Sequence, residues 1–257
     1  MQPVLLLVDD EEDILELLEN ILQSKYQIMK ASNGLEAIKL LSEEAVNLMI
    51  SDVMMPEMDG FELCRKVKST VEFSHIPVIL LTAKNTIQAK VEGLELGADA
   101  YIEKPFSKEH LLAQIHSLLT NRAMIRDFFA SSPLVHIKSI AHTKSDEKFL
   151  TQLNNEIQEH MEDLELDVEK LAKFMNMSRI TLYRKIKAVS NLTPLELINI
   201  SRLKKAAELL ANAEYKIYEV ADMVGYSSQS NFARNFQKQF NMTPTDYMHS
   251  KKKPSKN

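Results

Sequence analysis

Short apolar runs alternate with helical patterns from residue 4 to residue 121 of the chain. Val4–Val8 is an apolar run that ends in two aspartates, and it predicts a buried strand. The next residues place apolar side chains at helical spacing, and this order repeats. The predicted strands are 4–8, 27–31, 47–51, 78–82 and 100–102, and the helices after the first are 34–43, 60–69, 87–96 and 108–121. Such alternation predicts a five-stranded parallel sheet covered by helices on both faces.

The pattern changes after residue 121. The run Arg126–Phe129 extends the last helical pattern, and Ser131-Ser132-Pro133 interrupts it. From Asp146 onward the spacing is helical throughout, with no candidate strand, so we expect an α/β domain followed by an all-helical one. The expected divisions are 1–122 for the first domain, 123–147 for a linker, 148–250 for the helical domain and 251–257 for a basic tail.

Within the helical region the sequence repeats at an offset of 50 residues. The first copy contains Ser178, Leu182, Arg184, Ile186, Asn191, Thr193 and Pro194, and the second contains Ser228, Phe232, Arg234, Phe236, Asn241, Thr243 and Pro244. Each copy predicts a helix, a tight turn and a second helix that a serine caps. Gly225 supplies the backbone freedom that such a turn needs. Helix-turn-helix units place their second helix in the DNA major groove, although the same pattern also occurs in ordinary helical hairpins.

Charge differs between the two ends of the chain. Residues 1–125 carry 11 Lys and Arg against 20 Asp and Glu, a net of −9, whereas residues 171–257 carry 15 against 6, a net of +9. A basic segment fits a polyanion, although charged runs are often only solvated faces. No apolar run approaches the ~18 residues of a membrane span, so no membrane contact is expected. The single cysteine, Cys64, excludes an internal disulfide and favours a reducing, cytoplasmic compartment.

Three carboxylates follow two of the predicted strands. Asp9 and Asp10 follow the first strand and Asp52 follows the third. The carboxyl ends of parallel strands lie at one edge of the sheet, so these side chains are expected to be close together. Their mutual repulsion predicts a hard divalent cation, and Mg²⁺ suits a site of few carboxylates. Thr82 ends the fourth strand and Lys104 follows the fifth, so a hydroxyl and an ammonium are expected at the same edge. Together these groups can support phosphoryl transfer to a carboxylate, whereas each one alone has an ordinary structural role.

These strand ends resemble the receiver domain of two-component response regulators over roughly residues 1–122. The likeness rests on Val8–Glu11 (VDDE), Ile50–Gly60 (ISDVMMPEMDG), Leu81–Lys84 (LTAK) and Lys104–Phe106 (KPF). It implies a flavodoxin-like fold in which a histidine kinase phosphorylates Asp52, with Mg²⁺ held by Asp9, Asp10, Asp52 and the backbone carbonyl of Met54. It also implies that Thr82 and Lys104 bind the phosphoryl oxygens, that Lys104–Pro105 is a cis peptide, and that Tyr101 is the switch aromatic. Plain core packing is the alternative for Tyr101.

The helical region resembles the AraC-type DNA-binding domain over about residues 148–250. The likeness rests on Gly225–Arg234 (GYSSQSNFAR), Phe236, Phe240 and Thr243-Pro244. The residues expected to face DNA are Arg179, Ile180, Tyr183, Arg184 and Lys187 in the first recognition helix and Gln229, Ser230, Asn231, Arg234 and Lys238 in the second. We expect Lys185, Lys204, Lys205 and the tail lysines Lys251-Lys252-Lys253 to contact phosphates or to stay in solvent.

The two domains together resemble the C-terminal part of hybrid two-component regulators of Bacteroidetes. This implies a transcription regulator rather than an enzyme, with at most slow self-dephosphorylation, which binds double-stranded DNA and forms a homodimer when phosphorylated. The chain suits a free-standing regulator and also the cytoplasmic part of a membrane-anchored hybrid sensor. Two other functions stay open. One is a phosphoryl-transferring hydrolase, disfavoured because no further substrate domain follows, and the other is a DNA binder or adaptor that does not respond to phosphorylation.

Overall fold

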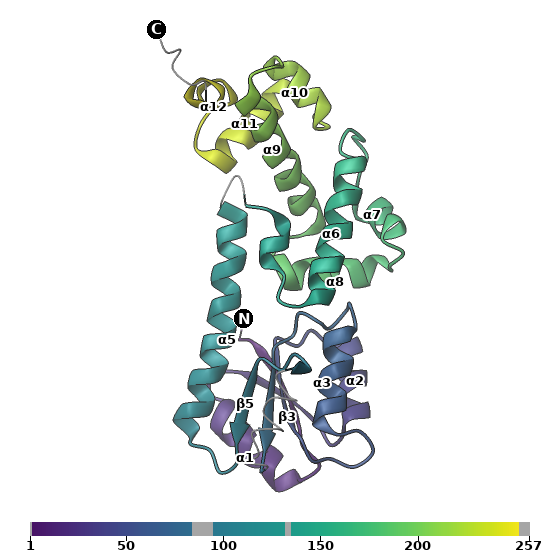
Figure 1. The fold of residues 1–257 in the computed structure, drawn as a ribbon, viewed down its shortest axis with the longest axis vertical. Coiled ribbons are helices and arrows are strands. Elements are labelled where there is room, and N and C mark those ends of the chain that lie inside the picture. The colour runs from purple at the N-terminus through teal and green to yellow at the C-terminus, as the bar shows by residue number, and fades with distance from the viewer. Residues whose placement is uncertain (1, 84–94, 132–134, 252–257) are drawn as a thin grey trace. The chain divides into compact units, whose positions relative to one another are not determined.

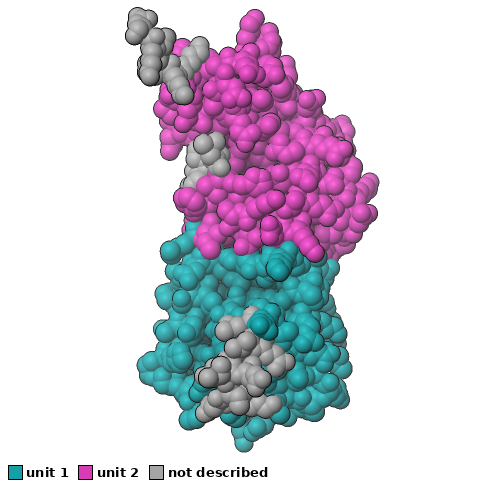
Figure 2. Space-filling model, in the orientation of Figure 1, with its two compact units in different colours: residues 1–124, 142–146 teal, residues 125–141, 147–257 magenta. Residues whose placement is uncertain are grey.

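A computed structural model of the chain describes residues 2–83, 95–131 and 135–251. They fall into two compact units, which Figure 2 distinguishes by colour: residues 1–124 with 142–146, and residues 125–141 with 147–257. Each unit has its own apolar core, so each is described by itself.

The first unit is a five-stranded parallel sheet with helices on both faces (Figure 1). The strands are β1 (Val4–Val8), β2 (Gln27–Ala31), β3 (Leu48–Asp52), β4 (Val78–Thr82) and β5 (Ala100–Glu103), in the spatial order β2-β1-β3-β4-β5. The helices are α1 (Glu12–Leu22), α2 (Gly34–Glu43), α3 (Gly60–Ser69) and α5 (Lys108–Ser131). The strand order is that of flavodoxin-like folds, which confirms the predicted fold. The helix predicted over 87–96 falls almost entirely outside the described residues.

Successive strand residues point to opposite faces of the sheet, and this alternation divides the core in two. Leu6 and Val8 of β1 pack with residues of α2 and α3, whereas Leu5 and Leu7 pack with residues of α1 and α5. Because both faces are covered, β3 and β4 are buried at every position, which explains their apolar runs. The register aligns Val8 with Ser51, so the carboxyl ends of β1 and β3 are adjacent.

Helix α5 continues ten residues beyond the predicted 108–121, because its sequence contains no glycine or proline before it ends at Ser131. The predicted linker, 123–147, therefore contains the end of α5, a 3₁₀ turn (η1, Ile137–Ile140) and the start of α6. Residues 125–141 cluster with the helical unit, whereas residues 142–146 cluster with the sheet unit.

In the second unit, the described elements from residue 135 onward are all helical. They are η1, α6 (Lys144–Glu159), α7 (Val168–Phe174), α8 (Arg179–Ser190), α9 (Pro194–Asn212), α10 (Ile217–Met223), α11 (Gln229–Phe240) and α12 (Pro244–Lys251). They share one apolar core with Phe129, Ile137 and Ile140, which precede α6 in the sequence. Within the described ranges, no helix is both long and apolar enough to cross a membrane.

The 50-residue repeat is also a repeat of structure. Helices α8 and α11 are both 12 residues long, and the side chains of Ser178 and Ser228 cap their first turns. Each helix ends at an asparagine in the left-handed conformation, with φ 59° at Asn191 and 54° at Asn241. The next helix then begins at a proline in both copies. The sequence predicts these two helices over 178–189 and 228–240, which agrees with α8 and α11 to within one residue.

Candidate functional site

The carboxyl edge of the sheet brings two carboxylates and one ammonium together. The Nζ atom of Lys104 lies 3.1 Å from Asp9 Oδ2 and 2.5 Å from Asp52 Oδ1. Asp9 is 1% exposed and Asp52 is 7% exposed, so both carboxylates are largely shielded from water. A cation between two buried carboxylates offsets their mutual repulsion. Three of the predicted site residues thus share one site, although each of them is more than 40 residues away from the next along the chain.

Burial and charge act in opposite directions on these groups. Burial raises the pKa of the Asp9 carboxyl above its usual value, and hydrogen bonds from the Glu11 backbone N–H and from Lys104 offset only part of this rise. Burial lowers the pKa of Lys104, but its bonds to Asp52 and Asp9 outweigh burial and leave the pKa raised. Lys104 is therefore held in its charged form beside Asp52.

The backbone around Asp52 is fixed by close contacts. The backbone N–H of Met54 donates to Asp52 Oδ2 at 2.6 Å, which orients the carboxylate. Gly60, at the start of α3, donates its N–H to the carbonyl of Val53 at 2.9 Å. A Cβ atom on Gly60 would lie 2.1 Å from the carbonyl oxygen of Asp52, so this position excludes every side chain.

The remaining predicted residues lie around this site. Asp10 follows Asp9 directly, and its side chain is exposed. Thr82 is fully buried at the end of β4, where its carbonyl accepts the backbone N–H of Lys104 at 2.7 Å. The hydroxyl of Tyr101 is buried, with no hydrogen-bond partner among the described residues. The Lys104–Pro105 peptide is cis, as predicted.

The donors at this edge fit Mg²⁺ in their chemistry. The carboxylates of Asp9, Asp10 and Asp52 and the backbone carbonyl of Met54 all offer hard oxygen ligands, and Mg²⁺ prefers such ligands together with water. The ammonium of Lys104 compensates part of the charge that a divalent cation would otherwise have to neutralise. The chemistry of these donors therefore fits Mg²⁺, which stays a prediction.

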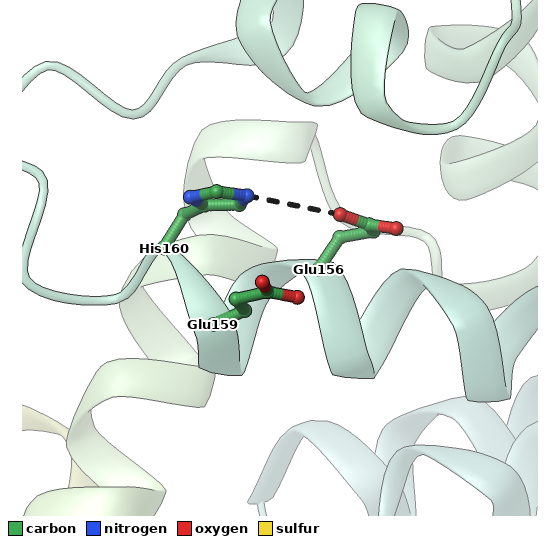
Figure 3. Close-up of side chains that lie close together, drawn as sticks. All are labelled: Glu156, Glu159 and His160. Carbon is green, nitrogen blue, oxygen red and sulfur yellow. Dashed lines mark ion pairs between the residues drawn. The ribbon is translucent and has the colours of Figure 1, made fainter.

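A different group has the tightest set of potential metal ligands in the described part of the chain. Glu156, Glu159 and His160, at the end of α6, bring their ligand atoms within 4.8 Å of one another (Figure 3). The Nε2 atom of His160 lies 3.9 Å from Glu156 Oε2, and its ring stacks on Phe174 at 4.0 Å between centroids. Acidic side chains commonly gather on exposed helix ends without an ion, so we assign this group no function.

The ten residues predicted to face DNA are all exposed. They lie on α8 and α11, whose opposite faces are buried in the core of the helical unit through Leu182, Ile186, Phe232 and Phe236. Some of these residues have partners within the described part of the chain. Arg179 forms an exposed ion pair with Glu169 at 3.1 Å, and Lys187 donates to the carbonyl of Asn191 at 2.7 Å. A DNA phosphate would compete with these partners.

Two lysines expected to contact phosphates or solvent are instead part of the fold. Lys185 is 1% exposed, and its ammonium lies 5.7 Å from the ring centroid of Phe149. Lys204 donates to the carbonyls of Phe129 and Val135 at 3.1 and 2.7 Å, and burial lowers its pKa to about 8. Both predictions were wrong because the partners come from segments that precede the repeat, where the repeat pattern gives no information.

Sequence reasoning also missed a charged cluster at the amino edge of the sheet. Asp99 accepts hydrogen bonds from Lys68 at 2.5 Å, from Arg122 at 2.8 Å and from the backbone N–H of Val78 at 2.9 Å. Lys68 and Arg122 are 7% and 8% exposed. Both cations lie in the apolar stripe of their own helix, since Lys68 is four residues after the buried Cys64 and Arg122 is seven residues after the buried Ile115. That position was the available signal.

Comparisons with known proteins agree with the two units. Residues 5–116 match the family described as response regulator receiver domain, and residues 171–250 match a helix-turn-helix domain family. Over 243 residues, or 95% of its length, the chain is 39% identical to histidine kinase P4 of Formosa agariphila, of which it spans 18%. Over 116 residues, or 45% of its length, it is 47% identical to the transcriptional regulatory protein GltR of Pseudomonas aeruginosa, of which it spans 48%.

Among solved structures, the chain resembles the signal receiver domain of a signal transduction histidine kinase from Syntrophus aciditrophicus. The two are 41% identical, with 46% of this chain and 91% of that chain covered and a TM-score of 0.44. The chain thus spans about half the length, or less, of the two curated relatives named above.

Proposed function

We propose that the chain acts as a phosphorylation-controlled transcription regulator, because residues 5–116 match the response regulator receiver domain family and residues 171–250 match a helix-turn-helix domain family. A histidine kinase is the proposed phosphoryl donor, double-stranded DNA the proposed target, and the cytoplasm the proposed location. The observation that carries the proposal is the ammonium of Lys104 between the carboxylates of Asp9 and Asp52, in a chain that also carries two exposed recognition helices.

The proposed reaction is transfer of a phosphoryl group to Asp52. A carboxylate oxygen of Asp52 attacks the phosphorus of the donor phosphohistidine, the new O–P bond forms, and the N–P bond breaks with the imidazole as leaving group. The ammonium of Lys104 and the hydroxyl of Thr82 are proposed to hold the phosphoryl oxygens. Mg²⁺, held by Asp9, Asp10, Asp52 and the carbonyl of Met54, would supply further charge neutralisation. Self-dephosphorylation is proposed to be slow, so the product serves as a signal.

Phosphorylation changes the balance of charge at this edge of the sheet. The phosphoryl group carries about 1.5 to 2 negative charges, but the Asp52 carboxylate loses its own charge in the new bond, so the site gains at most about one negative charge. Lys104, which bonds two carboxylates before the reaction, would follow the new oxygens. Tyr101 supports a two-state switch here. Its buried hydroxyl has no hydrogen-bond partner among the described residues, and an unbonded buried hydroxyl costs about 1–3 kcal/mol, which would favour a ring position in which the hydroxyl is bonded. We propose that this change favours a homodimer and raises DNA occupancy.

The proposed DNA contacts lie on the exposed faces of α8 and α11. The guanidinium groups of Arg179, Arg184 and Arg234 suit guanine edges, and the amides of Gln229 and Asn231 suit adenine edges. Lys187 and Lys238 stand further along each helix, where phosphate contact is the more natural role. The two helices begin with the same cap and have the same length, which supports parallel roles for them.

The test compares Asp52→Asn with the unchanged protein. Both are treated with acetyl phosphate and Mg²⁺, and affinity is measured for a duplex enriched by the protein from random-sequence DNA. Wild-type affinity should rise severalfold on phosphorylation, whereas Asp52→Asn should take up no phosphate and show no rise. Asp13→Asn removes an exposed carboxylate in α1 and should behave as wild type. A rise that persists in Asp52→Asn, or no rise in the wild type, would leave a DNA binder that phosphorylation does not control.

A further inference from the structure

The two recognition helices differ where the repeat makes them comparable. Helices α8 and α11 agree in length, in their serine caps and in their terminal asparagines, so residues 50 positions apart occupy equivalent places. Ile180 in α8 is equivalent to Ser230 in α11, and Tyr183 is equivalent to Ala233. The first helix therefore carries two large side chains with apolar surface at positions where the second carries small ones.

Neither of these side chains contributes to the core. Ile180 is 65% exposed, the largest exposed fraction of any large hydrophobic side chain in the described part of the chain, and Tyr183 is 42% exposed. They are three residues apart, so they lie on one face of α8. Leu182 and Ile186, on the other face, are fully buried. Folding alone therefore gives no reason for apolar side chains at 180 and 183.

Their surroundings indicate the kind of partner. Arg179, Arg184 and Lys187 are exposed on the same helix, so the apolar pair is flanked by cations. Residues 171–257 carry a net charge of +9, which favours a polyanion over an apolar protein surface. Ile180 is also in the first turn of α8, the part of a recognition helix that contacts base edges.

We infer that the two helices read their half-sites by different chemistry: α8 through contact of Ile180 and Tyr183 with thymine methyl groups, and α11 through hydrogen bonds from Gln229, Ser230 and Asn231. This inference rests on the proposed function, because it names what one part of the DNA-binding surface recognises. Thymine is the base that carries a methyl group in the major groove, so an aliphatic side chain can distinguish it without a hydrogen bond. Burying one such group contributes roughly 0.8 kcal/mol, or about fourfold in affinity.

The experiment removes the methyl group and keeps the hydrogen-bonding pattern. The full-length protein first enriches a duplex from random-sequence DNA, and each thymine of that duplex is then replaced singly by uracil. Wild-type affinity should fall about fourfold at one or two thymines within one half of the site. In Ile180→Ser, which gives α8 the residue found in α11, the same replacement should have no effect at one of these positions. Leu164→Ser is the matched control, because Leu164 is an aliphatic side chain outside both helices that is 60% exposed, and this variant should keep the wild-type response to uracil.

The outcomes separate the inference from the proposed function. If no duplex is enriched, the chain does not recognise DNA sequence and the proposed function fails. If a duplex is enriched but tolerates uracil at every thymine, or if Ile180→Ser loses as much affinity on replacement as the wild type, the inference is wrong and the proposed function stands. Because Ile180 is mostly exposed, the thermal unfolding midpoint of Ile180→Ser should equal that of the wild type, which excludes misfolding as the cause of a change.

Discussion

At the scale of single residues, the ammonium of Lys104 is the group that offsets two buried carboxylates. Replacing Lys104 by Met should leave Asp9 and Asp52 facing each other without a cation. We expect the free energy of unfolding at pH 7 to fall by about 1–3 kcal/mol, below the full range for a buried pair because the lysine is partly exposed. Urea unfolding in the absence of divalent ions measures this loss. Lys30→Met removes a lysine of the same unit that is 34% exposed and pairs with Glu12 and Glu19 at the surface, and it should change stability little.

The loss of unfolding free energy in Lys104→Met should also depend on pH, and the pKa of Asp9 decides whether it grows or shrinks as pH rises. Burial already raises the pKa of Asp9, and without the ammonium this pKa rises further. A carboxyl with a raised pKa in the folded state favours folding at low pH and loses that effect as pH rises. The free energy of unfolding that Lys104→Met loses should therefore be smaller at pH 5 than at pH 7. Added Mg²⁺ should reduce this loss at pH 7. An equal deficit under all three conditions would mean that the lysine acts only through packing.

The identity of the acidic-site residues could be predicted from the sequence because each one ends a strand. The period of the pattern places Asp9, Asp52 and Thr82 at strand ends, and parallel topology then brings those ends to one edge. The partners of Lys204 and the cluster around Asp99 could not be predicted in this way. Their contacts join segments whose own patterns do not indicate that they meet.

At the scale of elements, the end of α5 belongs to the helical core. Phe129 is 1% exposed, packs in that core, and lies under the ammonium of Lys204 at 3.8 Å. Phe129→Ala should destabilise the helical unit by about 3–5 kcal/mol, the usual cost of removing a buried aromatic ring. Thermal unfolding followed by circular dichroism provides the measurement. The neighbouring Phe128 is 61% exposed, so Phe128→Ala is the matched control. Equal losses in the two variants would contradict the burial of Phe129.

Most element boundaries follow from the sequence to within one residue. The strand expected at 47–51 spans Leu48–Asp52, and the helix expected at 60–69 spans Gly60–Ser69. The end of α5 was harder, because helical spacing continues past residue 121 while the face that it buries changes. Periodicity shows where a helix can continue, but it does not show which core the helix then joins.

At the scale of the whole molecule, the acidic N-terminal segment should repel DNA and the basic C-terminal segment should attract it. Residues 1–125 carry a net of −9, whereas residues 126–257 carry 20 Lys and Arg against 16 Asp and Glu. A fragment of residues 125–257 should therefore bind DNA more tightly than the unphosphorylated full chain at low salt, by about threefold to tenfold. The difference should shrink as salt rises, because the Debye length falls to about 3 Å at 1 M. Titrations across a salt series measure both affinities.

The salt dependence separates charge from obstruction. If the fragment keeps the same advantage at high salt, the first unit reduces binding by blocking the recognition helices rather than by repelling DNA. Both proteins should still lose affinity with salt, because lysines and arginines of α8 and α11 would release counterions from the phosphates. A fragment with no advantage at any salt would contradict the expected repulsion.

The repeated caps at Ser178 and Ser228, with asparagines ending both helices, bear on how such a protein can be retargeted. In each copy the capping residues and the buried side chains stabilise the fold, and the exposed side chains contribute little to it. Mutations on the outward side of one copy can accordingly accumulate without harming the other. An operator preference can then evolve, or be engineered, one half at a time.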